Sequence, residues 1–333
     1  MAEITQVKEI LDLSKLATIT GSEGVLIQSS TLSGKPLAYV NIEDLYNYIQ
    51  TKIAKNIDNH DIPRKTPKDI TSYYNDDTLW NRIAGSGGFA LKEDIYVGDY
   101  FKMKNGAISA YEKTGQYQTT GSDYVTIAGI STLKGNSDSI DMNYEHLVMV
   151  PGKGFGGIQH FGRARMNPNN VTTGGYGGSE MNTEIIGPVV SATATGSNLS
   201  INQQLYNEFG SHLKTTRELL SNSVNTEGYN RFGNAGGCSN GWNWYSCQAV
   251  LMSEIECYGS VIWGSSGRDI GTANHQLPLF FFNNMAKNNR TSYYWLKDVA
   301  SSIYFCRAHN DGHSGYYHAS AADIFVRPRF VIA

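Results

Sequence analysis

The sequence predicts an α+β fold, in which a helical region precedes a series of short strands. Two stretches between residues 180 and 220 place apolar side chains at helical spacing, and each stops at a glycine. After residue 245, short apolar runs alternate with turns rich in Gly, Asn, Ser and Pro, which is typical of short strands. No period of roughly 20–50 residues occurs, which argues against a repeat architecture. Helices and strands in separate runs indicate an α+β domain.

The composition allows about two domains and favours neutral surface contacts. The chain has 333 residues, against roughly 150 for an average domain. Hydrophobic residues make up 40%, enough for a packed core, but charged residues make up only 17%, below the usual ~25%. With 35 glycines and 21 tyrosines, such a chain makes its surface contacts through rings and neutral hydrogen bonds.

Charge and hydropathy argue against two kinds of partner. The net charge is −3 and no basic stripe stands out, so no nucleic acid partner is expected. Residues 1–16 contain early acids and no continuous apolar core, unlike a secretory signal. No apolar run approaches the roughly 18 residues of a membrane span, so no membrane insertion is expected.

Composition shifts divide the chain into three parts. Residues 1–55 hold an expected strand at Val25–Gln28 and an expected helix after Asn41, which is too little core to be stable alone. We therefore expect an N-terminal attachment and oligomerisation unit that packs against copies of itself or against a neighbour. Residues 56–84 are polar, contain two prolines and are interpreted as a linker. Residues 85–333 are expected to form the main domain.

Turn and cap residues mark the elements of this main domain. The expected elements are, in order, a hairpin around Asn105-Gly106, a buried strand at Leu147–Val150, a helix from Ser179 to Gly187, a helix over 199–210, a long Gly/Asn loop over 221–245, two short elements over 249–265, a buried segment over 276–284, and strands between 293 and 332.

Motifs in the C-terminal part resemble those of phage tail proteins with a C-type-lectin-like domain. The similar stretches are Glu256-Cys257-Tyr258-Gly259, Gln276-Leu277-Pro278-Leu279-Phe280, Trp295-Leu296-Lys297-Asp298-Val299 and Val326-Arg327-Pro328-Arg329-Phe330. Residues 146–167 and 212–228 look like the upstream half of the same domain. The resemblance covers residues 85–333 and, more loosely, the N-terminus, which is similar to the particle-attachment ends of such proteins.

This resemblance implies a C-type-lectin-like fold with long loops and a binding role. It extends to the variable proteins of diversity-generating retroelements, in which a strip just before the last strand is rewritten at adenine positions. In that family the strip forms the exposed binding face, usually on a homotrimer. The resemblance thus implies a homotrimeric virion protein of a tail tip or fibre, made in the host cytoplasm. Its N-terminus would join other phage tail proteins, and its ligand would be a host cell-surface receptor, either protein or glycan.

Residues 302–324 form the corresponding strip, and three of the eight histidines lie inside it within a stretch of ten residues. Tyrosine gives flat amphipathic contact area at small entropy cost, and Ser, Asn and Gly give adaptable hydrogen bonds, as in antibody paratopes. A diversified strip, a fixed receptor-binding loop and a structural loop all fit these residue types. The candidate ligand-binding residues are Ser302, Tyr304, Arg307, His309, Asn310, Asp311, His313, Tyr316, Tyr317, His318, Ser320 and Asp323.

Aromatic and basic residues near the strip have separate expected roles. Trp242 and Trp244 lie in the Gly/Asn loop and are candidates either for a sugar-stacking aromatic platform or for the core. Trp263 and Trp295 lie between apolar neighbours and are expected to be buried. Arg327-Pro328-Arg329 is expected to frame the last strand as scaffold.

No metal or cofactor is expected. Calcium-dependent lectins use a Pro-flanked Glu/Gln–Asn/Asp pair and a Trp-Asn-Asp run, and neither occurs here. Oxygen ligands for a hard cation could still come from Asp298, Asp311 and Asp323.

Zinc is the second metal to consider. His309, His313 and His318 could gather a zinc ion, but they lie in a glycine-containing loop, and the helical HExxH motif is absent. We interpret these histidines as solvated or receptor-facing.

The cysteines leave two states open. There are four, Cys238, Cys247, Cys257 and Cys306, and no CxxC pair suggests a zinc knuckle. The spacing admits a Cys238–Cys247 disulfide, whereas a reducing cytoplasm would keep four thiols. The formylglycine-generating relatives of the fold use a reactive cysteine pair, but no copper or redox motif accompanies Cys306 here.

Nothing specific points to an enzyme. Glu254 and Glu256 would share one face of a strand, as a glycoside-cleaving pair might need, and Asp269 or Asp298 could join them only through folding. The GKGFGG run at 152–157 lacks the Gly-Lys-Ser/Thr ending of a phosphate loop. We expect a phage tail receptor-binding protein that acts in host adhesion. The alternatives are a structural tail or baseplate protein that uses the lectin-like domain for assembly, and a polysaccharide-degrading tail enzyme.

Overall fold

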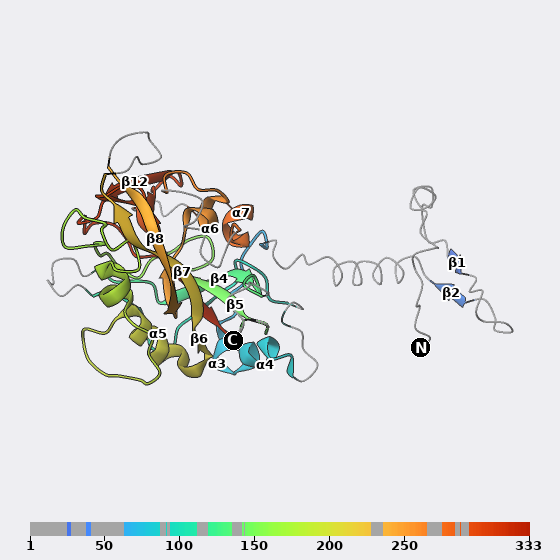
Figure 1. The fold of residues 1–333 in the computed structure, drawn as a ribbon. Coiled ribbons are helices and arrows are strands. Elements are labelled where there is room, and N and C mark those ends of the chain that lie inside the picture. Colours follow the sequence, from blue (N-terminus) through green and yellow to red (C-terminus); the bar gives the residue numbers. More distant parts are fainter. Residues whose placement is uncertain are drawn as a thin grey trace. The chain divides into compact units, whose positions relative to one another are not determined.

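The chain folds as two compact units, Met1–Asn59 and His60–Ala333 (Figure 1). The computed structural model describes residues 25–27 and 38–40 of the first unit, and residues 63–86, 91, 94–111, 119–134, 142, 144–227, 236–264, 275–283, 287 and 293–333 of the second. In the first unit, β1 (Val25–Ile27) pairs antiparallel with β2 (Ala38–Val40). The strand expected from Val25 is therefore present, whereas the helix expected after Asn41 lies outside the described residues.

An antiparallel six-stranded sheet forms the centre of the second unit (Figure 1). Its strands are β3 (Tyr100–Lys102), β4 (Tyr124–Ile130), β5 (Leu147–Pro151), β13 (Pro328–Ile332), β6 (Leu213–Lys214) and β9 (Ala249–Leu251). The order is β3-β4-β5-β13-β6, and β9 pairs with the first half of β13. The last strand of the chain is thus a central strand, with Phe330 opposite Met149 on one side and Ala249 on the other.

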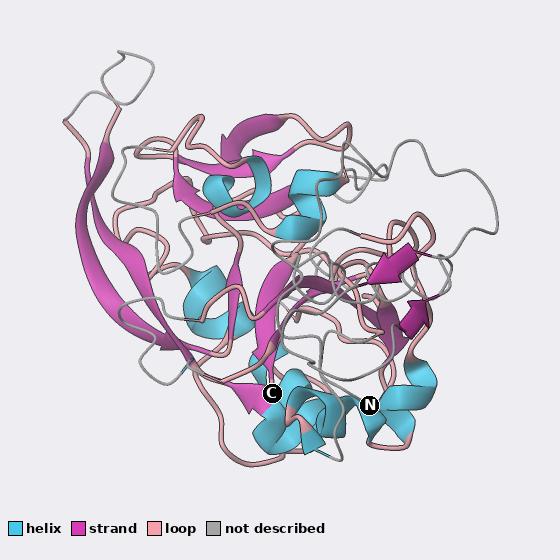
Figure 2. Ribbon diagram, turned by 90° about the vertical axis from the view of Figure 1, so that its right-hand side faces the viewer, coloured by secondary structure: helices cyan, strands magenta, loops and turns pink. Residues whose placement is uncertain are grey.

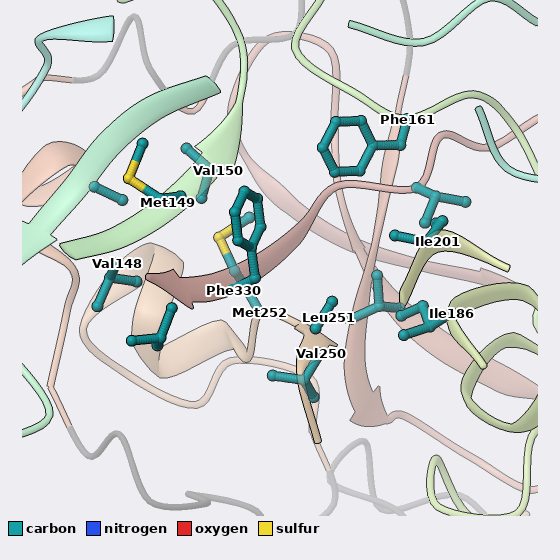
Figure 3. Packing of buried hydrophobic residues seen from close by; sticks show 14 of the residues in the cluster. Val148, Met149, Val150, Phe161, Ile186, Ile201, Val250, Leu251, Met252 and Phe330 are labelled. Atoms are coloured by element: carbon teal, nitrogen blue, oxygen red, sulfur yellow. The ribbon is translucent and has the colours of Figure 1, made fainter. Parts of the chain in front are cut away.

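Apolar side chains cover both faces of this central strand. Every residue of β5 and β13 is buried; β5 appears in the sequence as an unbroken apolar run, whereas β13 also buries Arg329. Figure 3 shows Phe330 among Met149 and Val150 of β5 and Met252, which follows β9. The buried strand expected at Leu147–Val150 is confirmed.

Cap residues set the two helices that the sequence predicts, and both are present. The first is a π-helix, η4 (Met181–Ile186), which ends at Gly187. The second, α5 (Ile201–Phe209), begins after Ser200, whose Oγ accepts a hydrogen bond of 3.2 Å from the N–H of Gln203. It ends at Gly210, and the short 3-10 helix η5 (Gly210–His212) leads into β6.

The segment interpreted as a linker is partly built into the second unit. Within residues 56–84, α3 (Thr71–Asn75) and α4 (Thr78–Ile83) bury Tyr74 and Leu79 in the core. The Tyr74 hydroxyl donates a hydrogen bond of 2.6 Å to the Glu208 side chain. Each helix has fewer than two turns, so the periodic apolar signal is too short to stand out among its polar neighbours.

The hairpin predicted around Asn105-Gly106 is not formed as expected. Gly106 has a φ of +89° and the chain does turn there. However, the strand that pairs with β3 is β4, which begins only at Tyr124. The turn therefore redirects the chain and does not close a two-residue hairpin.

The expected loop over 221–245 is instead largely a long ribbon of two antiparallel strands, β7 (Thr216–Asn225) and β8 (Cys238–Cys247), visible in Figure 2. Cys238 and Cys247 lie at opposite ends of β8, about 30 Å apart at ~3.3 Å per residue. A disulfide needs Cα atoms within about 7 Å, so these two cysteines cannot form one, and all four cysteines are thiols.

The remaining elements lie together near β12 in Figure 1. The helices are α6 (Glu254–Tyr258) and α7 (Pro278–Phe282), and the strands β10 (Tyr294–Val299), β11 (Tyr304–Ala308) and β12 (Ser314–His318) form a separate antiparallel sheet in that order. In the described part of the chain, no helix has the length and apolar character needed to span a bilayer.

Four charged side chains are buried where these elements meet the central sheet. Arg329 of β13 donates to Glu218 of β7 at 2.9 Å and also to Glu256 of α6. Lys297 of β10 lies 3.7 Å from both carboxylates. Although burial would raise the pKa of Glu218, the two cations lower it to about 2. The two negative and two positive charges of this cluster cancel. Their ion pairs join β7, α6, β10 and β13 into one framework.

Candidate ligand-binding surface

β11, β12 and the turn at residues 309–313 form a hairpin that carries most of the candidate residues. Tyr304 lies opposite His318, Phe305 opposite Tyr317, and Ala308 opposite Ser314. Successive side chains in a strand point to opposite faces, so the hairpin presents two different surfaces. β12 is the outermost strand of its sheet, and Tyr316 and Tyr317 are 36% and 39% exposed on opposite faces.

One surface is built around Arg307, and we call it the arginine face. The Arg307 guanidinium carbon lies 3.9 Å from the ring centroid of Tyr293 and 4.3 Å from that of Tyr317. Beyond it, the ring of His309 lies edge-on to Tyr293, with centroids 4.4 Å apart. Arg307 is half-buried, and burial lowers its pKa from the usual value for arginine. A cation held between two rings is a fixed, partly dehydrated group that suits anionic or aromatic ligands.

The other surface is the aromatic face. Here Tyr304 contacts Tyr316 and His318, with ring centroids 5.1 Å and 4.7 Å apart. Trp263 lies edge-on to Tyr316 at 5.3 Å, and its indole N–H donates to the Ser314 carbonyl at 3.1 Å. Four rings thus form a contiguous surface beside the edge strand.

A buried carboxylate fixes Trp263 against the hairpin. Glu254 of α6 accepts hydrogen bonds from the backbone N–H groups of Ile262, Trp263 and Gly264 at 2.8–2.9 Å. It also accepts one of 2.6 Å from the Ser314 hydroxyl. α6 itself starts in a capping box between Ser253 and Glu256. The aromatic face is therefore held by a framework with little freedom to move.

The turn of the hairpin brings three potential metal ligands together. His309 Nδ1 lies 3.0 Å and His313 Nδ1 lies 2.5 Å from the same carboxylate oxygen of Asp311. Among the described residues, this is the group of His, Cys, Asp and Glu side chains that could hold a metal ion. The sequence suggested that His309, His313 and His318 could share a zinc ion. This is wrong for His318, which lies at the far end of β12, about 16 Å along the strand from His313.

The oxygen ligands considered for a hard cation do not converge either. Asp298 is buried and accepts the N–H of Glu254 at 2.7 Å, so it caps α6. Asp323 is exposed on the loop before β13. Neither belongs to the cluster that Asp311 forms in the turn.

The other candidate strip residues lie at the base or the tip of the hairpin. Ser302 accepts the N–H of Thr172 at 3.0 Å, and its own N–H donates to Gly236. Ser320 donates its hydroxyl to Asn170 at 2.6 Å. These two serines tie the hairpin to neighbouring loops, whereas Asn310 is half-buried in the turn.

The tryptophans need two corrections. Trp242 and Trp244 lie on β8 of the ribbon and not in a loop, and the guanidinium of Arg217 lies 5.1 Å from the ring of Trp244. Trp295 is fully buried as expected, but Trp263 is only half-buried. Trp263 and Tyr293 thus complete the two faces, and Trp263 was expected in the core because its neighbours in the sequence are apolar.

The carboxylates considered for catalysis have structural roles. Glu254 and Glu256 lie on a helix and not on one face of a strand, and both are fully buried. Glu254 holds the 262–264 segment and Glu256 pairs with Arg329, while Asp269 lies outside the described residues. The basic residues framing the last strand are core residues: Arg327 lies 4.9 Å from the ring of Tyr294.

Comparisons of this chain with protein-family models, curated proteins and solved structures find no match.

Proposed function

We propose that the hairpin is the ligand-binding surface of a phage tail receptor-binding protein with a C-type-lectin-like domain. The observation that carries the proposal is the hairpin itself. It exposes Tyr316 and Tyr317 on β12 and His313 in the turn, whereas Phe305 and Cys306 of the paired strand β11 are buried. Rigid aromatic contacts with adaptable polar groups beside them are the composition of recognition surfaces.

The framework supports recognition rather than catalysis. Glu254 and Glu256, the carboxylates considered for catalysis, are buried and already hydrogen-bonded, so they are not free to act as acid and base on a bound sugar. We propose a non-enzymatic adhesin whose ligand is a protein or glycan of the host cell surface.

Several parts of the proposal come from the sequence resemblance alone. These are the homotrimer, attachment to other tail proteins through the N-terminal unit, a place on the virion at a tail tip or fibre, and diversification of the strip. Three copies would raise weak binding at each site by avidity. Diversification predicts a reverse transcriptase gene and a near-copy of the 3′ end beside this gene.

Replacement of both exposed tyrosines tests the proposal. Tyr316→Ala with Tyr317→Ala should abolish adsorption to receptor-bearing cells and leave folding intact, because both side chains lie on an edge strand. Tyr144→Ala is the matched control, since Tyr144 is 37% exposed on the loop before β5. Unchanged adsorption of a folded double variant would favour a structural tail or baseplate role.

A further inference from the structure

The turn at the hairpin tip is pre-shaped to hold three donor groups. His309 N–H donates to the His313 carbonyl at 2.8 Å, and Gly312 N–H donates to the His309 carbonyl at 2.9 Å. Gly312 has a φ of +91°, a conformation that favours glycine, so the turn depends on it. The His313 N–H adds a further bond to Asp311 at 3.2 Å. Five consecutive residues thus set two imidazoles around one carboxylate.

The donor atoms lie close to the spacing that zinc requires. The ligand atoms of the three side chains all lie within 4.8 Å of one another. Atoms bound to one zinc at 2.0–2.1 Å in a tetrahedron are about 3.3 Å apart. The present separations of 3.0 Å and 2.5 Å therefore need to open by less than about 1 Å. Asp311 and His313 are 61% and 59% exposed, so their side chains have room for this adjustment.

The donor set also selects the class of metal. Two imidazole nitrogens and one carboxylate oxygen suit zinc and similar divalent transition metals, whereas calcium and magnesium prefer oxygen throughout. Three protein ligands leave the fourth position of a tetrahedral zinc free, as in sites where zinc binds an outside group. Because the turn is exposed, that position would face solvent.

We propose that His309, Asp311 and His313 form a zinc site at the tip of the hairpin, whose open position takes an oxygen or nitrogen donor of the ligand. Each imidazole binds as the neutral form through Nδ1 and keeps its hydrogen on Nε2. The ion adds a positive charge next to the arginine face, since His309 contacts Tyr293. The site is independent of the proposed function, but its use in ligand binding rests on that function.

Metal binding to the full chain tests the site directly. Titration calorimetry with zinc should show one equivalent at this site, and cobalt at the same position should give the visible absorption of a tetrahedral complex. Asp311→Asn and His313→Gln should each weaken zinc binding by about tenfold or more. His318→Gln is the matched control and should bind zinc like the parent protein, because His318 lies at the far end of β12 from His313 and outside the cluster. Circular dichroism checks that each variant folds.

The results separate the metal site from the proposed function. Absence of zinc binding, or equal binding by the parent, Asp311→Asn and His313→Gln, would overturn the site. A second outcome is that zinc binds at the site and adsorption depends on Tyr316 and Tyr317, but neither a chelator nor His313→Gln changes adsorption. This outcome would overturn the role of the ion in recognition. If the tyrosine replacements also leave adsorption unchanged, the proposed function is wrong, but the zinc site is still supported.

Discussion

The Ser314 hydroxyl donates a hydrogen bond of 2.6 Å to the buried carboxylate of Glu254. This bond joins the edge strand of the hairpin to helix α6. The same carboxylate holds the backbone of residues 262–264, so one buried group positions both Trp263 and the strand that Trp263 contacts. The aromatic face depends on this connection.

Removal of the Glu254 carboxylate should destabilise the protein more than removal of the Ser314 hydroxyl. Glu254→Ala leaves three backbone N–H groups without their acceptor, at a cost of about 3 kcal/mol or more, because each unsatisfied buried group costs ~1–3 kcal/mol. Ser314→Ala removes one hydrogen bond and should cost about 1 kcal/mol. Chemical denaturation measures both free energies of unfolding. Equal losses would mean that the carboxylate does not hold the 262–264 segment.

Arg307→Lys should weaken adsorption to host cells and change the free energy of unfolding by less than about 2 kcal/mol, the value of a partly desolvated cation–π contact. Lysine keeps the charge but cannot lie flat between the rings of Tyr293 and Tyr317. Arg217→Lys is the matched control, because Arg217 contacts Trp244 on the ribbon. If Arg217→Lys lowers adsorption as much as Arg307→Lys does, the loss is not specific to the hairpin and the prediction is wrong.

The stability of the protein should fall between pH 6.5 and pH 4 because of His160. Burial, together with Arg327 and Arg163, lowers the pKa of His160 to about 4. In this range the unfolded chain takes up a proton that the folded protein does not. The free energy of unfolding is therefore highest above pH 6.5 and decreases by up to about 3 kcal/mol as the pH is lowered to 4.

His160→Gln tests this pH dependence, since glutamine keeps a neutral acceptor and cannot be charged. The free energy of unfolding is measured by denaturation at pH 7 and pH 4.5 for both proteins. The parent should lose about 2–3 kcal/mol more than the variant over this interval. Parallel losses in the two proteins would assign the acid sensitivity to other groups.

A thiol reagent should label one of the four cysteines in the native protein. Cys238 is half-buried, whereas Cys247, Cys257 and Cys306 are buried. Burial raises the pKa of Cys247 to about 12 and also raises that of Cys257, which removes the reactive thiolate. Mass spectrometry should find one label before denaturation and four after it. A mass lower by two hydrogens would instead reveal a disulfide.

Local signals in the sequence were enough for elements with strong caps or continuous apolar runs. Ser200 and Gly210 bound α5, and the run Leu147–Val150 is buried because both faces of β5 are covered. The two strands of the ribbon gave no such signal. β8 contains Gly and Asn and exposes much of its surface, so its pattern looked like a loop, although pairing with β7 makes it a strand.

The candidate surface shows the same division. The family resemblance pointed to the segment that holds its tyrosines, histidines and Arg307, and their residue types match those of antibody paratopes. Which of these residues lie together could not be predicted from the sequence, because it depends on which strand residues share a face. His313 and His309 meet across the turn, while His318, five residues after His313, lies beside Tyr304 at the other end of β12.

The sequence by itself determined the α+β class, the capped helices and the buried strands. Each of these depends on the periodicity or cap of a few neighbouring residues, which local backbone geometry dictates. Only the tertiary structure decided that Glu254 is a buried anchor, that Trp263 and Tyr293 belong to the surface, and that Asp311 stands between two histidines. Those relationships join residues from separate elements or opposite sides of a turn, and they arise only when the strands pair and the core closes.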